Sequence, residues 1–182
     1  MVLTGGASRR MGTDKALVEV DGVAMAARVA SALAGGGCDP VVCQGGDTQS
    51  LAVIGMTVLA DTHPGGGPVA AILDALSAVP DECVPDEYVV VCACDLAWMD
   101  AATVTKLITV AAGRPDADVV VACDANGPHL AGIWRPGSRR RLEALVAEGI
   151  QSYRGALERL TTVGVDVPPS VVANVNSPGD LH

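Results

Sequence analysis

The stretch MVLTGGASRRMGTDKA, residues 1–16, decides the fold expected for this chain. Its apolar start at residues 2–3 predicts a short strand, and the glycine pair at 5–6 allows the following backbone to adopt positive φ values. Backbone N–H groups without a neighbouring Cβ can approach an anion closely. The cations of the same loop are Arg9, Arg10 and Lys15. A strand followed by such a loop favours phosphate binding, with a plain surface turn as the alternative.

The rest of the chain is acidic, with a formal net charge of -9 over 182 residues. A nucleic-acid or anionic membrane surface would therefore need a local basic patch. Outside the front loop, basic residues gather only at 139–141 and at Arg154 and Arg159, in helix-like surroundings where charges are usually solvated. Aromatic residues, which stack on bases, make up only 2% of the chain. These features disfavour a nucleic-acid module, and we expect neither a nucleic-acid nor a membrane partner.

Size and apolar content predict a single domain over residues 1–182, because 49% hydrophobic residues in a chain of this length suffice for one full core. No apolar run approaches the roughly 18 residues that span a bilayer. The first residues show neither the charged nor the apolar segment of a secretory signal, so we expect a cytoplasmic protein. In that compartment the six cysteines are expected to be unpaired and structural, and their spacing matches no zinc site.

Apolar runs alternate with helical patterns along the chain, which predicts a layered α/β fold with a mostly parallel sheet. The expected strands are 2–3, 40–43, 57–60, 88–94, 117–122, 130–134 and 171–173. The expected helices are 24–33, 68–78, 101–112, 139–147 and 153–160.

Polar residues follow several of these expected strands. Asp61 and Asp95 each come just after one, and Asn174 and Asn176 follow the last. The carboxyl ends of parallel strands share one sheet edge, where ligands bind in a crevice. A single Asp after a strand is often only a turn or a helix cap. Several of them, together with the basic glycine loop, predict one site at that edge.

Four stretches resemble the molybdenum cofactor guanylyltransferases, a family of nucleotidyltransferases. LTGGASRRMGTDKALVEVDGVAM at 3–25 is similar to the family's signature loop, LAGGxSxRMGxDKALLxxxGxPL. The others are similar to family motifs in the same order along the chain: ADTHPGGGPVAAI at 60–72, CACDLAWMD at 92–100 and NVNSPGDL at 174–181. The resemblance covers essentially the whole chain. It implies a three-layer α/β/α, Rossmann-like nucleotidyltransferase fold.

The resemblance also implies a GTP site. The nucleotide-binding residues would be Leu3, Thr4, Gly5, Gly6, Lys15, Gln44, Asp61 and Asp95. The catalytic residues would be Lys15, Arg10 and Asp95, with Lys15 gripping the triphosphate and Arg10 assisting it. Asp95 would also hold Mg²⁺, the implied cofactor. Asn174 and Asn176 would face the pterin substrate or complete the metal's ligand shell.

The implied reaction is attack by the terminal phosphate of molybdopterin, with or without molybdenum, on the α-phosphorus of GTP. The products are a guanine dinucleotide cofactor and pyrophosphate. A phosphate monoester has a second pKa of about 6, so the nucleophile is ionised at neutral pH and needs no general base. Of the three histidines, His63 and His129 flank glycine or proline and are expected to be loop residues, with His129 able to meet the pterin. Implied partners are GTP, molybdopterin, other molybdenum cofactor biosynthesis proteins and apo-molybdoenzymes.

The chain departs from the family pattern at four small residues. Thr4 replaces an alanine, Ala71 a glycine, and Ala93 and Ala97 prolines. One alternative is a transferase of the same fold that uses CTP on molybdopterin, or GTP on a phospho-acid; the glycine pair favours guanine, because cytidylyl relatives typically read LAAG. The other is a GTP-binding regulator without catalytic activity.

Overall fold

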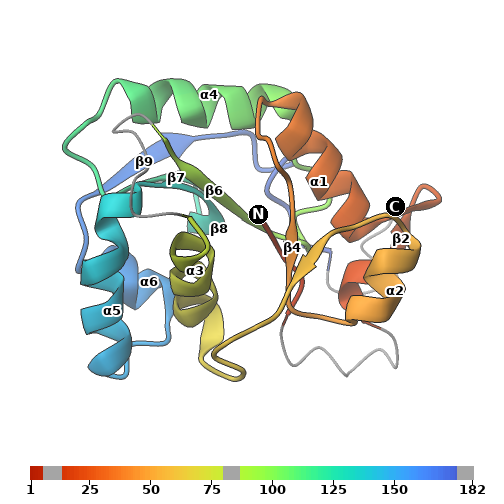
Figure 1. The fold of residues 1–182 in the computed structure, drawn as a ribbon. Coiled ribbons are helices and arrows are strands. Elements are labelled where there is room, and N and C mark those ends of the chain that lie inside the picture. The colour runs from red at the N-terminus through yellow and green to blue at the C-terminus, as the bar shows by residue number, and fades with distance from the viewer. Residues whose placement is uncertain (6–13, 80–86, 176–182) are drawn as a thin grey trace.

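The structure, a computed structural model, describes residues 1–5, 14–79 and 87–175, and contains a seven-stranded sheet (Figure 1). Its strand order is β5-β4-β1-β6-β8-β7-β9. The strands are β1 (Val2–Leu3), β4 (Cys43–Gln44), β5 (Val58–Leu59), β6 (Val89–Ala93), β7 (Val119–Asp124), β8 (Gly127–Trp134) and β9 (Thr162–Asp166).

Only β8 runs against the other strands of this sheet. It pairs antiparallel with both β6 and β7, while β1 pairs parallel with β4 and β6, β4 with β5, and β7 with β9. The α/β class and the mostly parallel sheet expected from the sequence are therefore confirmed. The six parallel strands all end at the same edge of the sheet, where the site was predicted.

Helices cover both faces of the sheet. Figure 1 shows α1 and α4 on one side and α3, α5 and α6 on the other. The helices are α1 (Met25–Gly35), α2 (Thr48–Val53), α3 (Gly67–Ser77), α4 (Ala101–Ala112), α5 (Arg139–Ala147) and α6 (Tyr153–Leu157), with short 3-10 helices η2 (Lys15–Leu17) and η3 (Pro136–Ser138). The bounds of α4 and α5 are those expected from the sequence.

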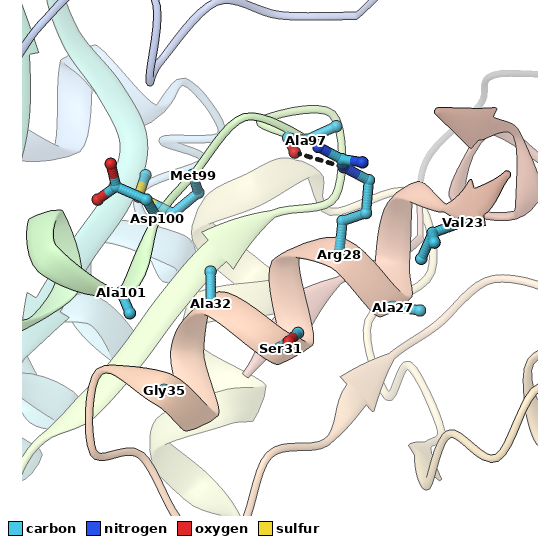
Figure 2. Close-up of a pocket in the computed structure, with 10 residues that line it drawn as sticks. All are labelled: Val23, Ala27, Arg28, Ser31, Ala32, Gly35, Ala97, Met99, Asp100 and Ala101. Carbon is cyan, nitrogen blue, oxygen red and sulfur yellow. Dashed lines mark hydrogen bonds between the residues drawn. The ribbon is translucent and has the colours of Figure 1, made fainter. Parts of the chain in front are cut away.

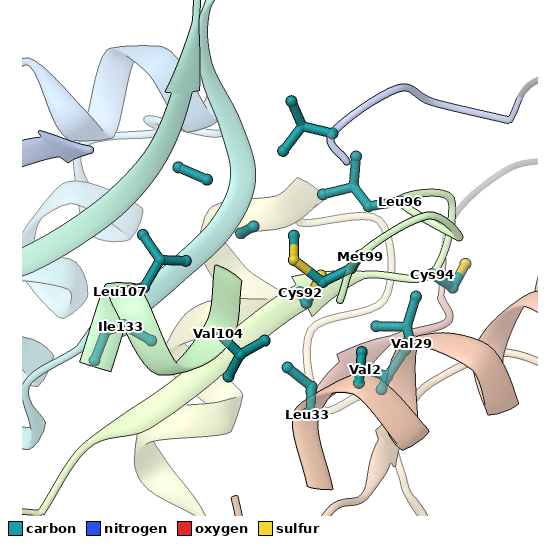
Figure 3. Packing of buried hydrophobic residues seen from close by; sticks show 14 of the residues in the cluster. Val2, Val29, Leu33, Cys92, Cys94, Leu96, Met99, Val104, Leu107 and Ile133 are labelled. Atoms are coloured by element: carbon teal, nitrogen blue, oxygen red, sulfur yellow. The ribbon is translucent and has the colours of Figure 1, made fainter. Parts of the chain in front are cut away.

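Two buried clusters fill the layers, and the strands β1, β6, β7 and β8 contribute to both. Along β7, Val119 and Val121 belong to the cluster under α3, α5 and α6, whereas Val120 and Ala122 belong to the cluster under α1 and α4. Successive side chains of a strand point to opposite faces, so a sheet covered on both sides needs an unbroken apolar run. In Figure 3, residues of α1 and α4 pack around Cys92 of β6.

Several elements were missed from the sequence. β2 (Glu19–Val20) and β3 (Val23–Ala24) form a separate antiparallel hairpin. Its turn is Asp21-Gly22, with φ values of 52° and 75°, and an Asp-Gly pair between short apolar runs is a strong hairpin signal. Another missed element is α2, whose N-cap Asp47 accepts hydrogen bonds from the N–H groups of Gln49 and Ser50.

The expected strand at 171–173 is wrong. Val171 and Val172 are buried, but they lie in a turn, and the edge strand is β9 instead. Pro168 and Pro169 begin this turn, in which Val171 N donates to the carbonyl of Pro168, and proline has a fixed φ and no N–H to donate to a strand ladder. β9 escaped notice because Gly164 interrupts its apolar pattern.

The cysteines that the structure describes are free, at positions 38, 43, 92, 94 and 123. Cys92 and Cys94 belong to the same buried cluster, as their spacing on one strand face predicts. Within the described part of the chain, no helix combines the length and apolar character needed to cross a membrane.

Replacing Ile133, which is only 1% exposed in the core, with alanine should lower the free energy of unfolding by about 2–5 kcal/mol, because the cavity cannot collapse fully. The matched control is Val53→Ala, at a side chain that is 86% exposed, where a change within about 0.5 kcal/mol is expected. Urea unfolding of both variants measures the difference, and equal midpoints would contradict the assigned core.

Candidate functional site

Three strand ends meet at the carboxyl edge of the sheet. The backbone N–H groups of Thr4 and Gly5, just after β1, both donate to the carbonyl of Gln44, at 3.0 Å each. Gly45 follows with a φ of +72°, and a Cβ on it would lie 3.0 Å from Gly5 Cα. Asp61 closes the group from β5, because its Oδ2 lies 3.8 Å from where a Cβ on Gly5 would stand. The predicted glycine loop and Asp61 are therefore neighbours.

Thr4, one of the departures from the family pattern, ties two of these strand ends together. Its buried hydroxyl lies 2.7 Å from the carbonyl oxygen of Gly45 and 3.0 Å from that of Gln44. An alanine at this position would offer no such donor. The threonine thus adds side-chain hydrogen bonding between the ends of β1 and β4, next to Gly5.

Lys15 and Asp95 come together from positions far apart in the chain. Lys15 Nζ lies 3.0 Å from Asp95 Oδ2, and the two side chains are 14% and 26% exposed. η2, which carries Lys15, begins after Asp14, whose carboxylate accepts from Ala16 N at 3.0 Å and from Asp47 N at 2.7 Å. The predicted triphosphate cation and the predicted metal ligand are therefore direct partners.

The C-terminal segment reaches the same place. Val175 N donates to the backbone carbonyl of Asp95 at 2.9 Å, which puts Asn174 beside the end of β6. Asn174 is exposed and lies in a loop, because the strand expected before it does not form. Four separate segments thus meet at one edge, as predicted. Gly6, Arg10 and Asn176 lie outside the described residues.

The side chains of two other predicted nucleotide ligands are buried. Leu3 is 7% exposed and packs in the cluster under α3. Gln44 is 3% exposed, and its Nε2 donates to Asp74 Oδ2 at 3.1 Å. Direct contact between the Gln44 side chain and a nucleotide stays a prediction. Sequence reasoning missed Asp74, although a lone carboxylate inside the apolar helix GPVAAILDALS is a signal of a buried polar contact.

The ligand set at Asp95 fits a hard divalent cation. Mg²⁺ is usually held by one or two carboxylates together with substrate phosphates, so a single aspartate beside the predicted phosphate loop would suffice. The adjacent thiol is unsuited to metal binding, because burial raises the pKa of Cys94 to about 12 and keeps it protonated. Among the described residues, no group of three or more His, Cys, Asp or Glu side chains forms a metal cage.

A groove of approximately 530 Å³ lies elsewhere, between α1 and the start of α4 (Figure 2). It is lined mostly by small apolar side chains, with Arg28 as its cation. Arg28 already donates to the carbonyls of Ala97 and Val20, both at 3.1 Å, and its guanidinium lies over the ring of Trp98. None of the predicted site residues lines this groove, so the predicted phosphate site and the groove are separate places in the fold.

Comparisons with known proteins find relatives along the chain. Residues 1–163 match the model of the MobA-like NTP transferase domain. A relative from Mycobacterium avium (strain 104), named "Probable molybdenum cofactor guanylyltransferase", is 31% identical over 184 residues, covering 100% of this chain and 92% of that protein.

Two solved structures share the fold. Molybdopterin-guanine dinucleotide biosynthesis protein A from Archaeoglobus fulgidus has a TM-score of 0.75 at 23% identity, covering 99% of this chain and 93% of its own. CMP:2-keto-3-deoxy-manno-octonic acid synthetase in complex with CTP has a TM-score of 0.71 at 14% identity, with the same coverage of 99% and 93%. At these identities both similarities concern the fold alone.

The close approach of β1 and β4 can be tested with two glycine variants. Gly45→Ala should destabilise the protein by about 1–3 kcal/mol more than Gly37→Ala, because only the first methyl group meets backbone atoms of Gly5. Gly37 is the matched control, since its φ of +100° is also unfavourable to alanine but nothing lies within 4 Å of its Cβ position. Chemical denaturation of both variants measures the difference. Equal losses would mean that the contact with Gly5 does not restrict residue 45.

Proposed function

Because the chain belongs to the MobA-like NTP transferase family, we propose that it transfers GMP from GTP to the terminal phosphate of molybdopterin. The products are the guanine dinucleotide form of the cofactor and pyrophosphate. The observation that carries this proposal is that Gly5, Asp61 and the Lys15–Asp95 pair lie at one sheet edge. These groups suit the binding of a nucleotide and its phosphates.

In this proposal the loop after β1 receives the nucleotide. Asp61 stands next to Gly5, where its carboxylate can accept hydrogen bonds from hydroxyl or N–H groups of the nucleoside. Lys15, which is paired with Asp95 at the same sheet edge, supplies positive charge for the triphosphate. Asn174 lies on the Asp95 side, where the acceptor must approach the α-phosphorus.

The chemical step forms one bond and breaks one. An ionised oxygen of the acceptor phosphate bonds to the α-phosphorus of GTP, and the bond from that phosphorus to the bridging oxygen of pyrophosphate breaks. The oxygen leaves with the electron pair, so negative charge grows on pyrophosphate, and Lys15 stabilises that charge. When bound, Mg²⁺ neutralises phosphate charge, and Asp95 would hold it. The protein's further contribution is alignment of the two phosphates.

We place this activity in the cytoplasm. The free cysteines of the described residues fit a reducing compartment. The product is a cofactor, so the enzymes that insert or use it are the expected partners, together with proteins that deliver molybdopterin. Pyrophosphate release with GTP, compared with CTP under the same conditions, tests the choice of nucleotide. Release with CTP alone would assign the chain to a cytidylyl transfer instead.

Lys15→Ala should lower kcat by a factor of about 10²–10³, by analogy with removal of one charge contact to the transition state. Pyrophosphate release in the presence of GTP, Mg²⁺ and molybdopterin measures the effect. Lys106→Ala is the matched control, because Lys106 is an exposed lysine that donates to a backbone carbonyl, that of Asp166. Unchanged turnover in the Lys15 variant would remove this residue from the mechanism.

Asp95→Ala should abolish Mg²⁺-dependent pyrophosphate release while the protein stays folded, because the side chain lies at a strand end and is 26% exposed. Circular dichroism checks the fold and a magnesium titration checks the activity. The control is Asp116→Ala, which removes an exposed carboxylate paired only locally, with Arg114. An Asp95 variant with the magnesium response of the natural protein would exclude this carboxylate as the metal ligand.

A further inference from the structure

A buried carboxylate lies behind the nucleotide loops. Asp74 belongs to α3, and its side chain is only 6% exposed. Its Oδ2 accepts from Gln44 Nε2 at 3.1 Å and from Thr62 N at 2.9 Å. Its Oδ1 accepts from the Thr62 hydroxyl and lies 2.6 Å from His63 Nδ1. Two other segments of the chain therefore converge on this one side chain.

These hydrogen bonds keep Asp74 charged. Burial on its own raises the pKa of the Asp74 carboxyl, but the hydrogen bonds from Thr62 and His63 outweigh that effect, so its pKa lies below the ordinary value. A carboxylate accepts only, so the His63 nitrogen that faces it carries a proton. An ionised group in an apolar helix costs free energy unless such donors surround it. Here the donors come from the last residue of β4 and from the segment that follows β5.

The contacts continue from Asp74 to the predicted nucleotide ligand Asp61. His63 N donates to Asp61 Oδ1 at 3.0 Å, so the segment that Asp74 binds also orients the Asp61 carboxylate. The other Asp61 oxygen, Oδ2, is the one beside Gly5. The position of Asp61 relative to Gly5 thus depends on the segment of Thr62 and His63, which is hydrogen-bonded to Asp74 of α3.

The second set of contacts runs through β4. Gln44 immediately precedes Gly45, and its carbonyl receives the N–H groups of Thr4 and Gly5. Its side-chain Oε1 is buried without a hydrogen-bond partner, whereas its Nε2 is held by Asp74. The contact with Asp74 is therefore the polar interaction that fixes this side chain. Asp61 and Gly45, which both lie next to Gly5, are therefore each connected to the Asp74 carboxylate through neighbouring residues.

We infer that Asp74 is a positioning residue of the nucleotide site: through Thr62, His63 and Gln44 it sets the Asp61 carboxylate and the Gly45 backbone against Gly5. The inference rests on the proposed nucleotide transfer and deepens it. Asp74 is too deeply buried to touch a nucleotide, so its effect reaches the ligand only through these neighbours. In this inference Gln44 has an indirect role, because its side chain donates to Asp74 while its backbone contacts Gly5.

A positioning role predicts a change in nucleotide affinity that loss of stability alone would not cause. Asp74→Ala should raise both KM and Kd for GTP about tenfold, equivalent to ~1.4 kcal/mol, and leave kcat within about twofold. KM and kcat come from pyrophosphate release, Kd from calorimetry with GTP and Mg²⁺, and the melting temperature from a thermal scan.

Asp118→Ala is the matched control. The Asp118 side chain is 13% exposed, accepts from Thr161 N at 2.8 Å and pairs with Arg141. It precedes β7 and so lies at the opposite edge of the sheet. Its loss should lower the melting temperature without changing KM or Kd for GTP. An unchanged KM and Kd in Asp74→Ala, with only a lower melting temperature as in this control, would overturn the inference.

Thr62→Val provides a second variant in case Asp74→Ala does not fold. It removes the hydroxyl that donates to Asp74 but preserves the shape of the side chain and the backbone N–H. We expect KM and Kd for GTP to rise about threefold. Values equal to those of the natural protein would contradict the inference. The natural protein tests the proposed function separately, because failure to bind GTP there would overturn that function and this inference together.

Discussion

Burial of the sheet on both faces is the constraint from which the site follows. Alternate residues of β7 enter different apolar clusters, and those clusters are closed by helices on either side. A polar ligand can therefore meet the sheet only at its edges. Because six of the seven strands run parallel, one edge collects all their carboxyl ends. Gly5, Asp61 and Asp95 are neighbours because each follows a strand that ends there.

Sequence reasoning reached this edge because its signals are local. Apolar runs locate strands, and an N-cap such as Asp100 locates the start of α4, so the bounds 101–112 could be predicted. The pair at 171–172 misled it because buried valines fit a turn as well as a strand, and the backbone preferences of Pro168 and Pro169 decided between them. Which strand lies at the edge depends on pairing, and no local pattern specifies that.

The predicted site shows the same division. That Asp61 and Asp95 approach the glycine loop could be inferred from topology, yet the 3.0 Å contact between Lys15 and Asp95 depends on where η2 begins. Asp74 was missed for a different reason. Its partners Gln44 and Thr62 are distant in the sequence, and a lone aspartate in a helix is usually solvated. Only the three-dimensional arrangement identifies the partners that surround its carboxylate.

The acidic character of the chain is compatible with the proposed binding of a polyanion, because Lys15 has a local partner in Asp95. Before a ligand binds, Asp95 balances its charge at a partly buried position, where an isolated ammonium group would be poorly solvated. In the proposed reaction, triphosphate oxygens and a divalent cation arrive together and can take the places of the two partners. Binding then exchanges one ion pair for two favourable interactions. In that reaction a nucleotide without the cation would leave Asp95 facing phosphate charge, so the Lys15–Asp95 pair would favour the metal-bound nucleotide over the metal-free one.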